Sequence, residues 1–315
     1  MKKDILSLLD LEVADFKYLF LRAIQLKKRF NQGISDRPLI GKSMGLIFDK
    51  KSTRTRISFE TAMIQLGGTP IYMSAQDTQI SRSEPPQDTA RALSRYLDAL
   101  VIRTFDHSIV ETFAKHSTIP VINALTDSFH PCQILSDIMT IIEFKGGYEG
   151  KKIVWIGDGN NVANSWVNAA AMVDLELVVA TPKGYEVSER VKKSSAKRRS
   201  KTALANTPSK TTFTNDPLEA IKDADVVYTD VWASMGQEDE QIKREADFKG
   251  FEVNKELLSY AKSDVIVMHC LPAHRGEEIS EDVLEGSHSV VWDQAENKRH
   301  MHKAILETLI LKTNI

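Results

Sequence analysis

Short apolar runs rich in β-branched residues recur along the chain, and within each run the apolar positions are continuous rather than alternating. A strand covered on both faces has this pattern, because every side chain packs against another layer. We therefore expect buried strands of parallel sheets in these segments. The runs lie at 44–48, 99–102, 153–156, 177–180, 225–228, 264–268 and 289–292.

Amphipathic stretches separate the runs, with apolar positions three or four residues apart, as on one face of a helix. Because strands and helices alternate, the sequence predicts an α/β fold built on parallel sheets. The stretches lie at 54–66, 88–97, 132–144, 162–173 and 216–222.

The segment KGGYEG, residues 145–150, divides this pattern into two blocks of similar size. Glycines after an amphipathic stretch are typical of a helix stop followed by a turn. We therefore expect two α/β domains, 1–147 and 148–294. A last amphipathic segment, 295–311, predicts a closing helix, and the pattern alone does not say which domain it packs on.

The balance of charge excludes functions that need a strong overall field. The 315 residues include 41 Lys and Arg and 43 Asp and Glu. Such a chain offers no bulk attraction to nucleic acid or to an anionic membrane, so anion binding must be local. The basic segment 190–201 has no interleaved aromatic residue for base stacking, and we expect a solvated helix end or loop there.

Cysteine usage and the first residues indicate a cytoplasmic protein. Cys132 and Cys270 are the only cysteines, and two distant thiols do not make a disulfide framework. Residues 1–20 mix charged residues with leucines, which does not match the apolar core of a secretory signal. We also expect no membrane partner, because no stretch is long and apolar enough to cross a bilayer.

The motif Ser52-Thr53-Arg54-Thr55-Arg56 follows the predicted strand 44–48 and opens the helix 54–66. A helix N-terminus presents unpaired N–H groups and partial positive charge, so hydroxyls and guanidinium groups beside it make a phosphate cradle. The alternative is an ordinary Ser N-cap with two exposed arginines. This segment alone does not decide between them.

Further polar groups stand where predicted strands end or helices begin. Arg103 follows the strand 99–102, at the edge where parallel strands line a ligand crevice, although it could also be a surface residue. In His130-Pro131-Cys132-Gln133, Pro131 suits the first helical position, and the turn offers an imidazole and an amide. Helix capping and core packing are the alternative roles of this turn.

The second block carries three such loops. Gly157-Asp158-Gly159-Asn160-Asn161 has the position of a dinucleotide loop but lacks its third glycine and its acidic partner, so a nicotinamide enzyme is only a runner-up. The loops 230–236 and 269–272 also follow predicted strands. Five polar clusters, at 52–56, 103, 157–161, 230–236 and 269–272, thus stand at the carboxyl ends of predicted strands, which neither a dehydrogenase nor a nucleic-acid-binding module explains.

The combination STRTR, HPCQ, DVWASMG and HCLP, in this order, resembles the aspartate/ornithine carbamoyltransferase family along nearly the whole chain, and the Ser-Met-Gly loop resembles the ornithine branch. The resemblance implies a carbamoyl phosphate site and an ornithine site. Residues expected at the first are Ser52, Thr53, Arg54, Thr55, Gln79, Arg103, His130, Pro131, Cys132, Gln133, Cys270, Leu271 and Lys298. Those expected at the second are Asn161, Asp230, Ser234 and Met235, with Arg103, His130 and Cys270 as catalytic residues.

The resemblance also implies a reaction and an assembly. Carbamoyl phosphate and L-ornithine would give L-citrulline and phosphate, in arginine metabolism, without a metal or organic cofactor. Residues 295–315 would return to the first domain, and the chains would form a homotrimer. This sequence departs from the family in two places. Ser83 replaces the glycine of the common Ser-Arg-Gly-Glu motif, and Lys298 stands where arginine is usual.

Overall fold

The computed structural model describes residues 4–74, 84–233 and 238–312. The chain forms two compact units, of which unit 1 comprises Met1–Met139 and Glu296–Ile315, and unit 2 comprises Thr140–Ala295. The units divide inside a helix, before the 145–150 turn at which the sequence pattern placed a boundary.

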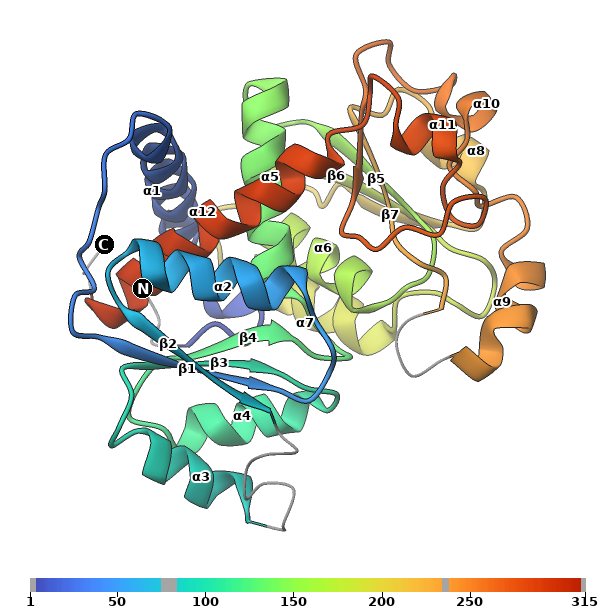
Figure 1. Cartoon of the computed structure of the whole chain (residues 1–315). Helices are drawn as coiled ribbons and strands as arrows, with labels where there is room; N and C mark the ends of the chain where they lie inside the picture. Colours follow the sequence, from blue (N-terminus) through green and yellow to red (C-terminus); the bar gives the residue numbers. More distant parts are fainter. Residues whose placement is uncertain (1–3, 75–83, 234–237, 313–315) are drawn as a thin grey trace. The chain divides into compact units, whose positions relative to one another are not determined.

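Unit 1 contains a four-stranded parallel sheet in the order β2-β1-β3-β4. Figure 1 shows α3 and α4 on one face of this sheet and α2 and α12 over the other. The strands are β1 (Ser43–Phe48), β2 (Thr69–Ser74), β3 (Ala99–Arg103) and β4 (Val121–Leu125). The helices are η1 (Leu8–Asp10), α1 (Val13–Asn31), α2 (Arg54–Gln65), α3 (Pro86–Leu93), α4 (His107–His116), α5 (Pro131–Lys145, continuing into unit 2) and α12 (Val291–Ile310, beginning in unit 2).

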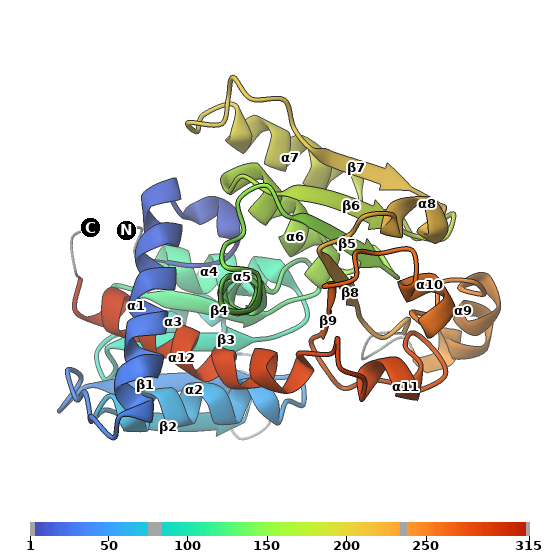
Figure 2. The ribbon, with the colours of Figure 1, turned by 90° about the horizontal axis from the view of Figure 1, so that it is seen from above.

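Unit 2 contains a five-stranded parallel sheet in the order β7-β6-β5-β8-β9. Figure 2 shows its strands side by side with α6 and α7 near β5 and β6. The strands are β5 (Lys152–Ile156), β6 (Glu176–Ala180), β7 (Thr211–Thr214), β8 (Val226–Thr229) and β9 (Ile266–His269). The remaining helices are α6 (Asn161–Met172), α7 (Glu189–Arg199), α8 (Pro217–Ile221), η4 (Glu238–Glu240), α9 (Gln241–Asp247), α10 (Lys255–Leu258) and α11 (Glu281–Leu284).

Both sheets have a point where consecutive connections leave in opposite directions, between β1 and β3 in unit 1 and between β5 and β8 in unit 2. In open parallel sheets a ligand crevice forms at the carboxyl ends of strands at such a point. Ligand-binding residues are therefore expected directly after β1 and β3 in unit 1 and after β5 and β8 in unit 2.

The continuous apolar runs are strands, except for one. The prediction of a strand at 289–292 is wrong, because Val291 and Trp292 begin α12 and only Ser289 forms an isolated bridge, with Val267. The buried valines at 290 and 291 belong to the entry of a long helix, whose first turn has the same short apolar appearance as a buried strand.

Helix α12 supplies part of the core of unit 1, as the family resemblance implied. Met301, Ala304, Ile305 and Leu306 on this helix have no exposed surface. The basic segment 190–201 forms most of α7, where Arg199 is buried and donates to the carbonyl oxygen of Ala170. That guanidinium therefore joins two helices of unit 2 instead of extending into solvent.

Candidate active site

The start of α2 and one residue of α12 form a positively charged corner in unit 1. Lys298 Nζ donates to Thr55 Oγ1 over 3.2 Å, and both side chains are almost completely buried. The N-cap residue, Thr53, accepts no hydrogen bond from the first helical amides with its side chain. A helix N-terminus beside an ammonium group favours an anionic ligand.

The neighbouring residue Arg299 is directed elsewhere. Its Nη2 lies 3.0 Å from Glu296 Oε1, and its guanidinium lies over the ring of Phe30, 4.6 Å from the centroid. Successive helical residues differ by about 100° in direction, so one of the two must face away from α2. The cation in this corner is therefore Lys298.

His130 stands at the start of α5 and has 4% of its surface exposed. Burial lowers the pKa of His130 well below its usual range, and the charges of Lys298, Arg103 and His302 lower it further. Arg103, the last residue of β3, is itself 6% exposed. A neutral imidazole beside two cations can donate a hydrogen bond to a carbonyl oxygen without losing a proton.

The first turn of α5 holds a thiol and an amide with different surroundings. Burial raises the pKa of Cys132 to about 12, and its Sγ donates to the carbonyl oxygen of Asn123, so the thiol belongs to the core. Gln133 Nε2 donates to Asp137 Oδ1 over 2.8 Å. Gln133 Oε1 is buried, and within the described part of the chain no group donates to it. That oxygen suits a ligand with an N–H donor.

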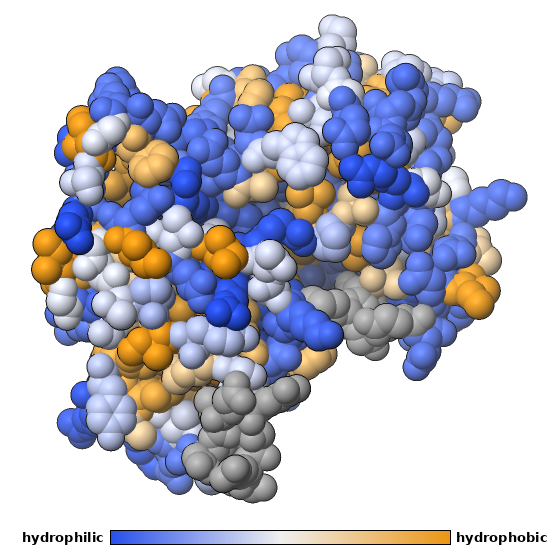
Figure 3. Space-filling view, viewed as in Figure 1, coloured by the Kyte–Doolittle hydropathy of each residue, from blue (hydrophilic) through white to orange (hydrophobic). Residues whose placement is uncertain are grey.

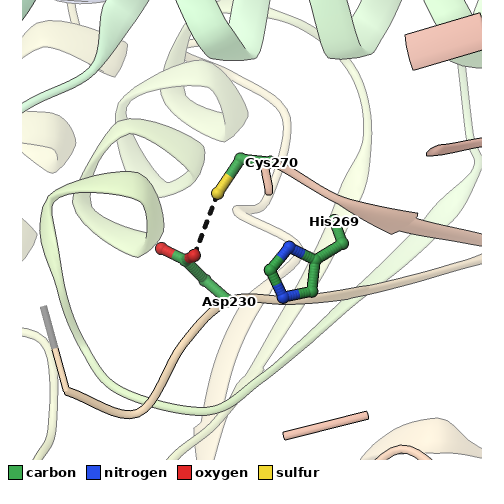
Figure 4. A group of neighbouring side chains, drawn as sticks. All are labelled: Asp230, His269 and Cys270. Atoms are coloured by element: carbon green, nitrogen blue, oxygen red, sulfur yellow. Dashed lines mark hydrogen bonds between the residues drawn. The ribbon is translucent and has the colours of Figure 1, made fainter. Parts of the chain in front are cut away.

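Unit 2 presents a carboxylate at the end of β8. Figure 4 shows Cys270 pointing at Asp230, with Sγ 3.0 Å from Oδ1. The second oxygen of Asp230 accepts from Asn160 Nδ2 over 2.9 Å. Asp230 is 7% exposed and follows Thr229, the last residue of β8. A nearly buried carboxylate held in this way suits an ammonium group.

The side chains of Asp230, His269 and Cys270 place three potential metal-binding atoms within 4.8 Å of one another. His269, however, uses both ring nitrogens, because Nδ1 accepts from the amide of Leu271 and Nε2 lies 2.9 Å from Glu278 Oε1. A histidine in this state has no lone pair for a cation. The donor set therefore does not fit a metal held by all three residues.

A second carboxylate of unit 2, Asp158, lies between β5 and α6. Burial raises its pKa to about 6, and the charge of Asp230 raises it further, whereas Arg244 acts in the opposite direction. Arg244 Nη1 lies 3.0 Å from Asp158 Oδ2 and also donates to the carbonyl oxygen of Trp232. This ion pair therefore ties the residues after β8 to the end of β5.

Family models of known proteins match both units of the chain. The family model for the carbamoyl-P binding domain of aspartate/ornithine carbamoyltransferases matches residues 3–143. The model for the Asp/Orn binding domain of the same family matches residues 149–309. The chain belongs to the aspartate/ornithine carbamoyltransferase family.

Similarity to individual members of the family extends along nearly the whole chain. The ornithine carbamoyltransferase of Syntrophus aciditrophicus is 56% identical over 310 residues, covering 98% of this chain and 100% of the relative. That of Geobacter sulfurreducens is 51% identical over 292 residues, 93% of this chain and 94% of the relative. The solved ornithine carbamoyltransferase from Pyrococcus furiosus superposes with a TM-score of 0.92 at 48% identity, over 99% of this chain and 98% of that one.

Some residues that the family resemblance assigns to the site lie outside the described residues. These are Gln79, Ser234 and Met235, together with the departure at Ser83. Leu271 is described and has a backbone φ of +57°. Asn161 is the first residue of α6, directly after Asn160.

The sequence did not predict the contacts of three further groups beside the carbamoyltransferase motifs. Asn160 had a detectable signal, since an asparagine before a predicted helix favours an N-cap, and it accepts from the amides of Val162 and Ala163. The Asp158–Arg244 pair and the contact of Glu278 with His269 had no detectable signal in the sequence, because no spacing rule predicts contacts between residues at these separations.

Proposed function

We propose that this chain transfers the carbamoyl group of carbamoyl phosphate to the δ-amine of L-ornithine, producing L-citrulline and phosphate. The observation that carries the choice of acceptor is the nearly buried carboxylate of Asp230, held by Asn160 and Cys270 in the unit matched to the Asp/Orn binding domain. A carboxylate attracts the α-ammonium of ornithine, and relatives near half identity carry that enzyme's name.

The phosphate of carbamoyl phosphate binds at the start of α2 in this proposal. Ser52, Arg54 and the helical amides surround the anion, and Lys298 beside Thr55 supplies a point charge. This arrangement stabilises the charge that the leaving phosphate gains as its bond to the carbamoyl carbon breaks.

The carbamoyl group lies next to the phosphate and needs both donors and acceptors. Neutral His130 and the guanidinium of Arg103 donate to its carbonyl oxygen, where negative charge develops in the tetrahedral intermediate. The carbamoyl nitrogen is a donor, and Gln133 Oε1 and the backbone carbonyls near Cys270 and Leu271 are the acceptors we assign to it.

Ornithine must present an uncharged δ-amine to the carbamoyl carbon. Asp230 pairs with the α-ammonium, and Asn161, Ser234 and Met235 complete the site by resemblance. A free amine of this kind has a pKa of about 10.4, so about one molecule in a thousand is ready to attack at pH 7. Either Cys270 or the phosphate of the other substrate accepts the proton that the amine releases.

We also propose a homotrimer. Strand β2 is an edge strand whose side chains are all exposed or half-buried, and α2 beside it exposes Ile57 and Ile64 by 52% and 59%. Figure 3 shows hydrophobic side chains on the same face, separated by polar ones. An open edge with exposed apolar groups is a surface that a second chain can cover. Gln79 follows β2 and would act in the neighbouring subunit's site.

The same proposal extends to location and pathway. No helix in the described ranges is both long and apolar enough to cross a membrane. Neither Cys132 nor Cys270 forms a disulfide in the described part of the chain, which suits a reducing compartment. We propose a cytoplasmic enzyme of arginine biosynthesis.

An assay of the purified protein with carbamoyl phosphate and four acceptors tests the function. Citrulline formation from ornithine should exceed carbamoylation of putrescine, aspartate and acetylornithine. Faster turnover with putrescine or aspartate would contradict the assignment of Asp230. Sedimentation during turnover tests the assembly, because a fully active monomer would exclude a shared site.

A further inference from the structure

Glu278 is a carboxylate with no exposed surface. Its Oε1 accepts from His269 Nε2 over 2.9 Å and from the amide of His274 over 2.7 Å. No group among the described residues donates to its Oε2. A buried carboxylate with one oxygen unsatisfied is unfavourable for folding, so a purely structural role would be served better by an apolar side chain.

The hydrogen bonds of His269 extend from Glu278 to the backbone of the next loop. The amide of Leu271 donates to His269 Nδ1 over 2.8 Å, so this nitrogen carries no proton. The proton of the neutral ring is therefore on Nε2, where it is donated to Glu278. Glu278 thus selects the tautomer that can accept the Leu271 amide.

Leu271 needs such a restraint. Its φ of +57° lies in the left-handed region, which residues with a Cβ adopt only when their surroundings hold them there. Glu278 itself is anchored, since its carbonyl oxygen accepts from the amide of Val253 over 2.9 Å and the adjacent Ile279 forms a bridge to the same residue. The restraint therefore runs from a hydrogen-bonded backbone segment to the loop that carries Cys270.

We propose that Glu278 and His269 are positioning residues for carbamoyl transfer. By holding Leu271, they set the direction of the Cys270 and Leu271 carbonyl groups toward the carbamoyl nitrogen and hold Cys270 against Asp230. This inference rests on the proposed function. Neither residue touches the substrates, so removing either should disturb the geometry of the reaction more than substrate affinity.

Three variants test the proposal. Glu278→Met removes the acceptor while keeping the volume, and Glu278→Gln keeps an acceptor oxygen without the charge. Glu277→Gln is the matched control, because Glu277 is half-buried and contacts His274 and Gln241 but not His269. Each is assayed per mole of folded protein, with melting temperatures measured in parallel.

The expected result is a kcat for Glu278→Met lower by about tenfold to a hundredfold, because small misplacements of reacting groups have effects of that size. Glu278→Gln should fall between it and the unmodified protein, and Glu277→Gln should match the unmodified protein. The KM for carbamoyl phosphate should change by less than about threefold, since the phosphate binds at α2. A lower melting temperature with unchanged kcat would overturn the proposal, as would an equal loss in Glu277→Gln.

Hydrogen exchange at the Leu271 amide gives a second measurement that does not depend on activity. The amide should be protected in the unmodified protein and in Glu277→Gln, and should exchange faster in Glu278→Met. Unchanged protection in Glu278→Met would overturn the link between Glu278 and the loop while leaving the proposed function intact. An unmodified protein that makes no citrulline would instead refute the proposed function, and the positioning role with it.

Discussion

Lys298 and Arg299 show how adjacent cations on one helix face different environments. Lys298 reaches Thr55 at the start of α2, whereas Arg299 pairs with Glu296. Lys298→Ala should therefore raise the KM for carbamoyl phosphate by about tenfold to a hundredfold, the loss of one charge-assisted hydrogen bond. Arg299→Ala is the control and should leave the KM for carbamoyl phosphate nearly unchanged. Steady-state kinetics of both variants decide the assignment, and the opposite pattern would place Arg299 at the phosphate.

Arg103 tests whether charge alone is sufficient at the end of β3. A lysine there keeps the charge but cannot direct two N–H groups at the phosphate and the carbonyl oxygen together. Arg103→Lys should lower kcat/KM by more than about tenfold, or about 1.4 kcal/mol. A smaller loss would remove Arg103 from the site. Lys50, which pairs with Asp127 in the same unit, is not an alternative donor for this role.

Asp158 makes stability depend on pH in a direction opposite to that of most carboxylates. Burial raises its pKa from 3.8 to about 6, so the folded protein holds this proton more tightly than the unfolded chain does. The stabilisation that this bound proton provides is about 3 kcal/mol. It is fully present below about pH 4 and is lost as the pH rises through about 6.

Unfolding of the Asp158→Asn variant measures this contribution. The asparagine cannot ionise, so the stability of the unmodified protein relative to the variant should fall between pH 4 and pH 7. Urea denaturation across that range provides the difference. A difference that rises with pH would show that the ion pair with Arg244 outweighs burial.

The predictability of individual residues follows from how they are placed along the chain. Ser52 to Thr55 could be proposed as a phosphate site from the sequence because a helix start gathers consecutive residues at one point. Glu278 could not, because its partner His269 is reached through a loop whose path no spacing rule describes. The assignment of Lys298 needed the family resemblance, since α2 and α12 are far apart in sequence.

At the scale of elements, burial on both faces decided which strands were predictable. Strands β1, β3, β5, β6, β8 and β9 have nearly continuous burial and were predicted. The strands β2 and β7 were missed because they lie at sheet edges with exposed side chains. Strand β4 was also missed although it is nearly fully buried, because the polar Asn123 interrupts its apolar run. The side chain of Asn123 donates to the carbonyl oxygen of Leu6.

The turn between β5 and α6 depends on a glycine for space. A Cβ on Gly159 would lie 2.5 Å from the carbonyl oxygen of Tyr185 and 2.6 Å from the amide nitrogen of Val187. Both are backbone atoms, so Gly159→Ala should lower stability by about 1–3 kcal/mol. Gly147→Ala is the control, since only the flexible carboxylate of Glu149 is near. Equal melting temperatures of the two variants would contradict this reading of the turn.

At the scale of the whole molecule, unit 1 is assembled from both ends of the chain and unit 2 from one continuous segment. The side chains of Met301, Ile305 and Leu306 fill the core of unit 1. Each large apolar side chain contributes about 1.5–3 kcal/mol when buried. A fragment of residues 1–139 should therefore fail to unfold cooperatively by itself.

Addition of a peptide spanning residues 291–315 should restore a cooperative transition to that fragment. The same peptide with Ile305→Asp is the control and should not, because a carboxylate would enter the core. Thermal denaturation followed by circular dichroism measures both mixtures. A cooperative transition of 1–139 without peptide would show that α12 is dispensable for unit 1.

The position of α12 reverses the order in which a growing chain can finish folding. Residues 1–139 leave the ribosome first, but their core stays open until Val291–Ile310 has been synthesised. Unit 2 is complete earlier, although it is made later than most of unit 1. A product that terminates before residue 291 would expose the apolar surface that α12 covers, and so become a substrate for chaperones and proteases.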